Sequence, residues 1–187
     1  KRNIFGNARD YRRFVCLLYA CNRTIPVDLK LQGSTLYDLL KINQGEPIVD
    51  IVAYCLMPNH FHILISEKTD GGISKFMQKL TTAYTMYFNK SKDRNGALFQ
   101  GKFKAKHASI NDNYLKYLIA YIHLNPIKLI EPDWKENGIK NSKQAEEYIT
   151  QYPYSSYLDF YGQDRIEKNI LNTKPLPAYF AGELNNF

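Results

Sequence analysis

The sequence has few cysteines and no long apolar run, and each shortage excludes a class of protein. Its three cysteines, Cys16, Cys21 and Cys55, are an odd number without the Cys-x-x-Cys spacing of a metal or redox motif. We therefore expect reduced, mostly buried thiols, as in a cytoplasmic protein. No apolar run approaches the ~18 residues that span a bilayer, and no signal peptide is visible, so we expect no membrane partner.

The composition is that of a folded, basic protein. A chain of 187 residues with 44% hydrophobic and 14% aromatic content fits one α+β domain with a proper core. Its 25 Lys and Arg residues outnumber 18 Asp and Glu residues, which leaves a formal charge of +7. A surplus of this size is typical of nucleic-acid binders, although many basic proteins bind no nucleic acid.

The hydrophobic periodicity predicts three helices and one hairpin. Apolar residues recur at three- and four-residue intervals in the helical segments, which are 8–22, 73–90 and 114–125. Pro126 disfavours helical geometry at the residue before it, so the third helix should end or kink there. Two apolar runs, 48–57 and 60–66, flank Pro58-Asn59 and predict a β-hairpin.

Two histidines one residue apart lie in the second strand of this hairpin. Because side chains alternate in a strand, His60, His62 and Leu64 should share one face, with the imidazoles roughly 6–7 Å apart at the backbone. That spacing suits two ligands of one metal ion. The alternative is a pair of partly buried histidines that bond to neighbouring groups.

The third predicted helix carries three tyrosines near one face, Tyr114, Tyr117 and Tyr121. Any of them can be a packing aromatic. Asn125 follows Tyr121 by one turn and should lie beside it. It can cap the helix before Pro126, take part in a site with Tyr121, or do both.

A basic segment precedes this helix. Lys102, Lys104 and Lys106 alternate with Phe103 and Ala105, so a strand here would project the three charges together, with Arg94 just before them. Such a patch can track a DNA backbone through phosphate contacts, or it can be an ordinary solvated face.

Taken together, these segments resemble the single-tyrosine HUH transposases, and within them the REP-associated tyrosine transposases. The resemblance covers roughly residues 2–162. The stretches that carry it are Asn3-Ile-Phe5, the Tyr-Cys-Leu-Met-Pro-Asn-His-Phe-His-Ile-Leu-Ile of 54–65, the Phe-Met-Gln-Lys-Leu-Thr-Thr-Ala-Tyr of 76–84, the Leu-Phe-Gln-Gly-Lys-Phe of 98–103, the Tyr-Ile-His-Leu-Asn-Pro of 121–126, and the Tyr-Ser-Ser-Tyr of 154–157.

The resemblance implies a ferredoxin-like fold, an antiparallel sheet with helices packed on one side. It assigns residues 1–162 to one HUH domain, whose first strand lies upstream of Lys1, and 163–187 to an extended C-terminal tail. It also implies that Tyr121 is the nucleophile and that the amide oxygen of Asn125 is a third metal ligand beside His60 and His62.

The expected chemistry is cleavage of single-stranded or hairpin DNA with Mg²⁺ or Mn²⁺. The ion would fix the leaving 3′ oxygen while the phenol forms a 5′-phosphotyrosine ester. Related transposases are often homodimers, and members of the most similar branch can act as monomers. Two alternatives stay open from the sequence: a DNA-binding module that does not cleave, and a metal phosphoesterase that uses water.

Overall fold

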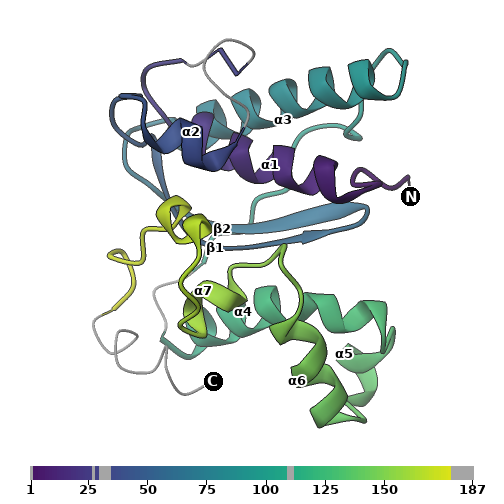
Figure 1. The fold of residues 1–187 in the computed structure, drawn as a ribbon. Helices are drawn as coiled ribbons and strands as arrows, with labels where there is room; N and C mark the ends of the chain where they lie inside the picture. The colour runs from purple at the N-terminus through teal and green to yellow at the C-terminus, as the bar shows by residue number, and fades with distance from the viewer. Residues whose placement is uncertain (1, 27, 30–34, 109–111, 178–187) are drawn as a thin grey trace.

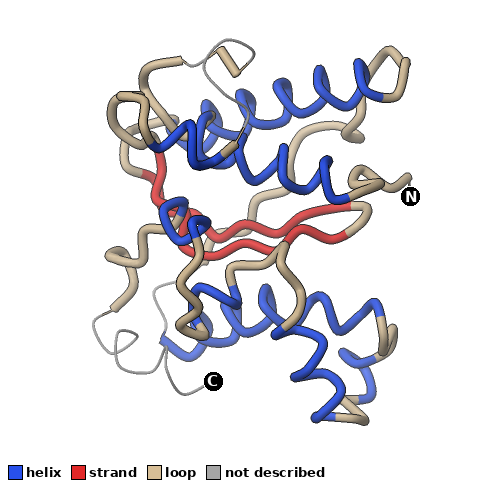
Figure 2. Tube along the Cα trace, in the orientation of Figure 1, coloured by secondary structure: helices blue, strands red, loops and turns tan. Residues whose placement is uncertain are grey.

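The fold is organised around a single antiparallel hairpin. The computed structural model describes residues 2–26, 28–29, 35–108 and 112–177. Strand β1 (Val49–Met57) pairs with β2 (His60–Glu67), and the first pair beyond the turn is Met57 with His60. The predicted hairpin around Pro58 and Asn59 is confirmed, and its two strands lie at the centre of the molecule (Figure 2).

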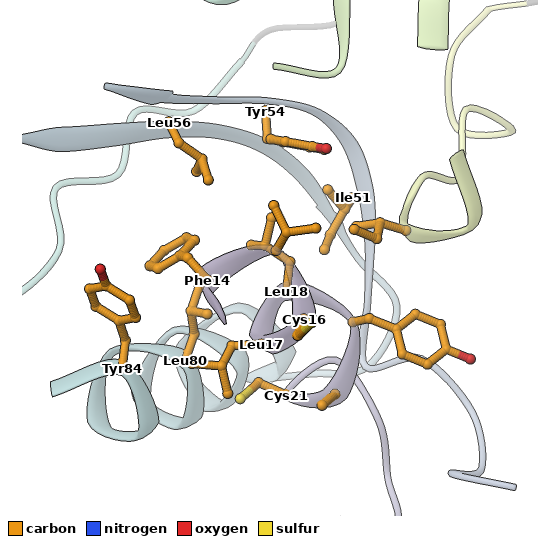
Figure 3. Close-up of a cluster of buried hydrophobic side chains, with 14 of the residues drawn as sticks. Phe14, Cys16, Leu17, Leu18, Cys21, Ile51, Tyr54, Leu56, Leu80 and Tyr84 are labelled. Atoms are coloured by element: carbon orange, nitrogen blue, oxygen red, sulfur yellow. The ribbon is translucent and has the colours of Figure 1, made fainter. Parts of the chain in front are cut away.

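Two long helices cover one face of the hairpin. Helix α1 (Ala8–Ala20) begins at Asn7, whose side chain accepts a hydrogen bond from the Asp10 backbone, and α3 (Gly72–Ser91) follows β2. Their apolar stripes meet strand β1 in the main core, where Phe14, Leu18 and Leu80 are fully buried (Figure 3). Both helices lie where the three- and four-residue spacing of apolar residues predicts them.

Helix α4 (Asp112–Leu124) covers the opposite face of the hairpin (Figure 1). Its residues Ile119 and Ile122 form a second apolar cluster with Ala53 and Cys55 of β1. The expected α+β class, an antiparallel sheet with helices packed against it, is confirmed. The helices lie on both faces rather than on one, because all nine residues of β1 are buried and both of its faces therefore need an apolar cover.

Short elements complete the chain. Helix α2 (Leu36–Leu40) precedes the sheet. The other short elements follow α4, and they are η1 (Asn125–Leu129), α5 (Trp134–Asn137), α6 (Ser142–Thr150), α7 (Tyr157–Phe160) and η2 (Ile166–Ile170). Helix α4 passes into η1 at Asn125, as expected from Pro126. A third apolar cluster joins η1, α6 and α7 around Ile127 and Ile149.

The C-terminal part of the described chain lies along the free edge of β1. The Tyr54 carbonyl accepts from the Ser156 backbone N–H at 2.9 Å, and the Ile51 carbonyl accepts from the Asn172 N–H at 2.8 Å. Ile170 of η2 is buried in the main core. Residues 163–177 therefore pack onto the domain instead of forming the expected extended tail, whereas 178–187 lie outside the described residues.

A buried ion pair fixes this C-terminal segment. Arg165 donates to both oxygens of Asp159 and to the carbonyls of Pro153 and Ser155, and the two charged side chains are 12% and 1% exposed. Arg165→Met leaves a buried carboxylate without its partner, so we expect a loss of about 3 kcal/mol in the free energy of unfolding. Urea denaturation measures it, with the exposed Arg12→Met as control. A loss no larger than that of the control would contradict the assignment.

The three cysteines are buried thiols, as expected from the sequence. All three cysteines are buried and none forms a disulfide. Burial raises the pKa of Cys16 and of Cys21 to about 11, which keeps both thiols protonated and poorly reactive. None of the helices in the described ranges has the length and apolar character needed to cross a bilayer.

Candidate active site

The two faces of β2 serve different purposes. Phe61, Ile63 and Ile65 pack against the main core under α1 and α3. Leu64, from the alternate set, packs with α4 on the other side, and His62 contacts Tyr121 of that helix. The alternation predicted from the sequence therefore directs the histidine face toward α4.

The histidine pair has a donor set that suits a divalent ion. The rings of His60 and His62 are 4.9 Å apart between centroids and nearly perpendicular, at 85°. Nδ1 of His60 lies 2.6 Å from Oδ1 of Asn59, an interaction that orients the ring. Two imidazoles held this close offer two nitrogen ligands from one short stretch of strand.

His62 is the more buried member of the pair. Burial, with the nearby charges of His60 and Lys135, lowers the pKa of His62 to about 4, so its ring is neutral at pH 7. Its Nε2 is buried and has no hydrogen-bond partner among the described residues. A buried ring nitrogen without a partner is costly unless something binds it, and a neutral imidazole is a metal ligand.

The ring of Tyr121 contacts the histidine pair through His62. Its ring centroid lies 5.6 Å from that of His62, at 82°, although 58 residues separate them along the chain. One helical turn later, the side-chain nitrogen of Asn125 donates to the Tyr121 carbonyl at 2.6 Å, and Asn125 is 1% exposed. That bond uses the amide nitrogen, so the amide oxygen is the atom suited to bind a metal.

The described residues contain no group of three or more His, Cys, Asp or Glu side chains that could hold a metal. A third ligand from the amide oxygen of Asn125, as the resemblance implies, stays a prediction. Glu67, the last residue of β2, is engaged elsewhere, because its carboxylate accepts from the Ile73 backbone N–H at the start of α3.

One residue of this site has no signal in the sequence. Lys135 of α5 donates a hydrogen bond from Nζ to the Tyr121 hydroxyl at 2.5 Å. It lies in a polar stretch without hydrophobic periodicity, fourteen residues beyond Tyr121. No spacing rule relates the two positions, so only the folded chain shows the contact.

The family comparison covers most of these residues. A model of the IS200-like transposase family matches residues 28–125, which contain the histidine pair, Tyr121 and Asn125. The chain belongs to the IS200-like transposase family. Comparison with curated proteins and with solved structures gave no match.

The other tyrosines of α4 differ from Tyr121 in their surroundings. Tyr117 of this transposase is 64% exposed and stacks on Tyr121 with centroids 6.2 Å apart. The ring of Tyr114 lies 5.6 Å from Nζ of Lys106. Of the three, it is Tyr121 whose ring contacts His62.

His123, two positions after Tyr121 on α4, packs in the core. It is 5% exposed, its Nε2 lies 2.9 Å from the Ser156 hydroxyl, and its ring contacts Phe160 at 4.8 Å. Burial lowers the pKa of His123 to about 3, so the ring is neutral within the apolar cluster. It is thus part of the core of the transposase.

The basic segment of the transposase does not form the expected strand. Residues 102–108 are irregular, so strand alternation does not align Lys102, Lys104 and Lys106, although all three are exposed. Arg94 donates to Oδ1 of Asn89 and to the Ala97 carbonyl, and it therefore helps to close the loop after α3. DNA contact by these four residues stays a prediction.

Salt dependence tests whether the three lysines touch DNA. Each phosphate contact with a single strand contributes about 0.7 to the slope of log affinity against log salt. If all three side chains contact phosphate, changing Lys102, Lys104 and Lys106 together to Gln should flatten the plot by about two units. Fluorescence anisotropy with labelled single-stranded DNA measures the slope. A slope equal to that of the parent protein would identify the segment as a solvated surface.

Proposed function

We propose that this transposase is a metal-dependent endonuclease and strand transferase for single-stranded DNA, with Tyr121 as its nucleophile. The observation that carries the proposal is the contact between His62 and Tyr121, which joins the histidine face of β2 to the tyrosine helix. One turn further along the same helix, the buried Asn125 donates to the Tyr121 carbonyl, which supports its proposed role in the same site.

The proposed step conserves the energy of the DNA backbone. The Tyr121 oxygen loses its proton and bonds to phosphorus, while the bond from phosphorus to the 3′ oxygen breaks and that oxygen takes up a proton. The 5′ phosphate then stays esterified to the phenol. Attack by a 3′-hydroxyl on the same ester, with the proton transfers reversed, rejoins a strand without ATP.

His60, His62 and Asn125 are the residues that would hold a divalent ion, Mg²⁺ or Mn²⁺. The buried Nε2 of His62 without a partner, the neutral ring and the adjacent imidazole fit such a group. When bound, the ion would supply charge stabilisation at the scissile phosphate and its leaving oxygen. The protein's own contribution is to orient the rings and to place the phenol beside them.

The resemblance to REP-associated transposases favours a substrate that folds into an imperfect hairpin. A stem offers shape and backbone, and unpaired flanking bases offer edges that a protein can read. Since β2, α4 and η1 of one chain supply all four proposed residues, a monomer can hold a complete site, and a homodimer is not needed to build it.

A denaturing gel tests the proposal against its two rivals. The protein is incubated with Mg²⁺ or Mn²⁺ and a labelled single-stranded library in which an imperfect hairpin is flanked by randomised bases. We expect a DNA band shifted by a covalently attached protein. Cleavage without such a band would indicate hydrolysis by water, and gel-shift binding without cleavage would indicate a DNA-binding module.

A further inference from the structure

We propose that Lys135 is a second catalytic residue of this site, which holds the Tyr121 hydroxyl in place and sets a positive charge beside the phosphate that bonds to it. This inference rests on the proposed function of Tyr121. Lys135 lies beyond residues 28–125, so the family match does not include it.

Two contacts join Lys135 to the tyrosine. Its Nζ donates to the phenol oxygen at 2.5 Å and lies 4.2 Å from the ring centroid. Together they restrain both the position of the oxygen and the rotation of the ring. His62 contacts the same ring, so the nucleophile is held between a lysine and an imidazole.

The lysine is attached to a structured part of the chain. Its neighbour Trp134 packs against the apolar cluster around Ile127. Ile127 belongs to η1, which directly continues helix α4. Lys140 and Asn141 follow α5, and their backbone N–H groups donate to the carboxylate of Glu131, which precedes α5, at 2.9 and 3.1 Å. These bonds close the loop around α5. Lys135 is therefore positioned by the same framework that positions Tyr121.

The chemistry of the step explains what a cation does here. When the Tyr121 oxygen bonds to phosphorus, the phosphate becomes attached to the atom that Nζ already contacts. Negative charge on the non-bridging oxygens then lies within reach of an ammonium, which binds phosphate as a compact point charge. A donor fixed before the reaction stabilises that charge without reorganisation.

The ammonium also stays beside the product. In the phosphotyrosine ester the same lysine lies next to the phosphodiester, where it favours the attached state until a 3′-hydroxyl attacks. We therefore expect Lys135 to affect both formation of the adduct and its resolution. A lysine that only covers a surface tyrosine would affect neither rate.

The test compares Lys135→Met and Lys135→Arg with Lys128→Met. Lys128 is an exposed lysine of η1, and its substitution removes the same charge without touching Tyr121. The probe is the one hairpin oligonucleotide most enriched in adducts from the labelled library. Single-turnover rates are measured across DNA concentration, so that the maximal rate and the half-saturating concentration are separated, and melting temperatures are recorded alongside.

We expect Lys135→Met to lower the maximal rate of adduct formation about tenfold or more, with the half-saturating DNA concentration and melting temperature unchanged. Lys135→Arg keeps the charge and should restore most of the rate. Lys128→Met should match the parent protein. Equal maximal rates for Lys135→Met and Lys128→Met, or an effect confined to half-saturation, would overturn the role of Lys135 while leaving Tyr121 as nucleophile. No adduct with the parent protein would instead overturn the proposed function itself.

Discussion

Tyr121→Phe should abolish the covalent adduct with single-stranded DNA while leaving the fold intact. The substitution removes the one oxygen that the mechanism requires and keeps the ring that packs against His62. Because no other group replaces a missing nucleophile, we expect adduct formation to fall by roughly a thousandfold or more. The melting temperature should change little, since the ring remains and Tyr121 is only partly buried. Adduct is quantified on denaturing gels and stability by thermal melting.

The chain supplies a matched control four residues earlier on the same helix. Tyr117→Phe removes an equivalent hydroxyl from an exposed ring that stacks on Tyr121. We expect it to form adduct at the parental level. Adduct formation by Tyr121→Phe together with its loss in Tyr117→Phe would move the nucleophile to the neighbouring position.

The double change His60→Ala and His62→Ala should separate cleavage from binding. Removing both imidazoles takes away the proposed nitrogen ligands, and the charge stabilisation lost is several kcal/mol, or roughly a thousandfold in rate. DNA affinity should change by less than about twofold, because phosphate contacts made elsewhere carry it. Nicking and anisotropy are measured in the same buffer with Mg²⁺ or Mn²⁺.

His107→Ala is the control for this experiment. His107 is exposed and lies in the irregular segment before α4, so its loss removes an imidazole outside the proposed site. It should nick at the parental rate. If the double histidine variant nicks DNA at the rate of His107→Ala, the assignment of His60 and His62 to the active site is wrong.

The hairpin and its histidine face were predictable because they follow from local rules. Alternation in a strand fixes which side chains share a face, and a two-residue connection fixes the pairing of Met57 with His60. The end of α4 was also predictable from the sequence, since Pro126 restricts the backbone of the residue before it. These rules need only neighbouring residues, which the sequence displays directly.

The remainder depends on contacts between distant segments. Helix α4 covers the second face of β1 because that strand is buried on both sides, and its apolar run does not say which helix lies on which side. Lys135 reaches Tyr121 only through the turn that Glu131 and Trp134 fix. The segment 102–106 has an alternating pattern that is typical of a strand, but it pairs with neither β1 nor β2 and is irregular.

The most direct test of the account is to identify the residue that carries DNA. Adduct formed by the parent protein is digested with nuclease and trypsin, and the peptide 117–128, which contains both Tyr117 and Tyr121, is sequenced by tandem mass spectrometry. We predict a nucleotide attached through a 5′ phosphate to Tyr121. A nucleotide on Tyr117, on a residue outside this peptide, or on none at all would contradict the account.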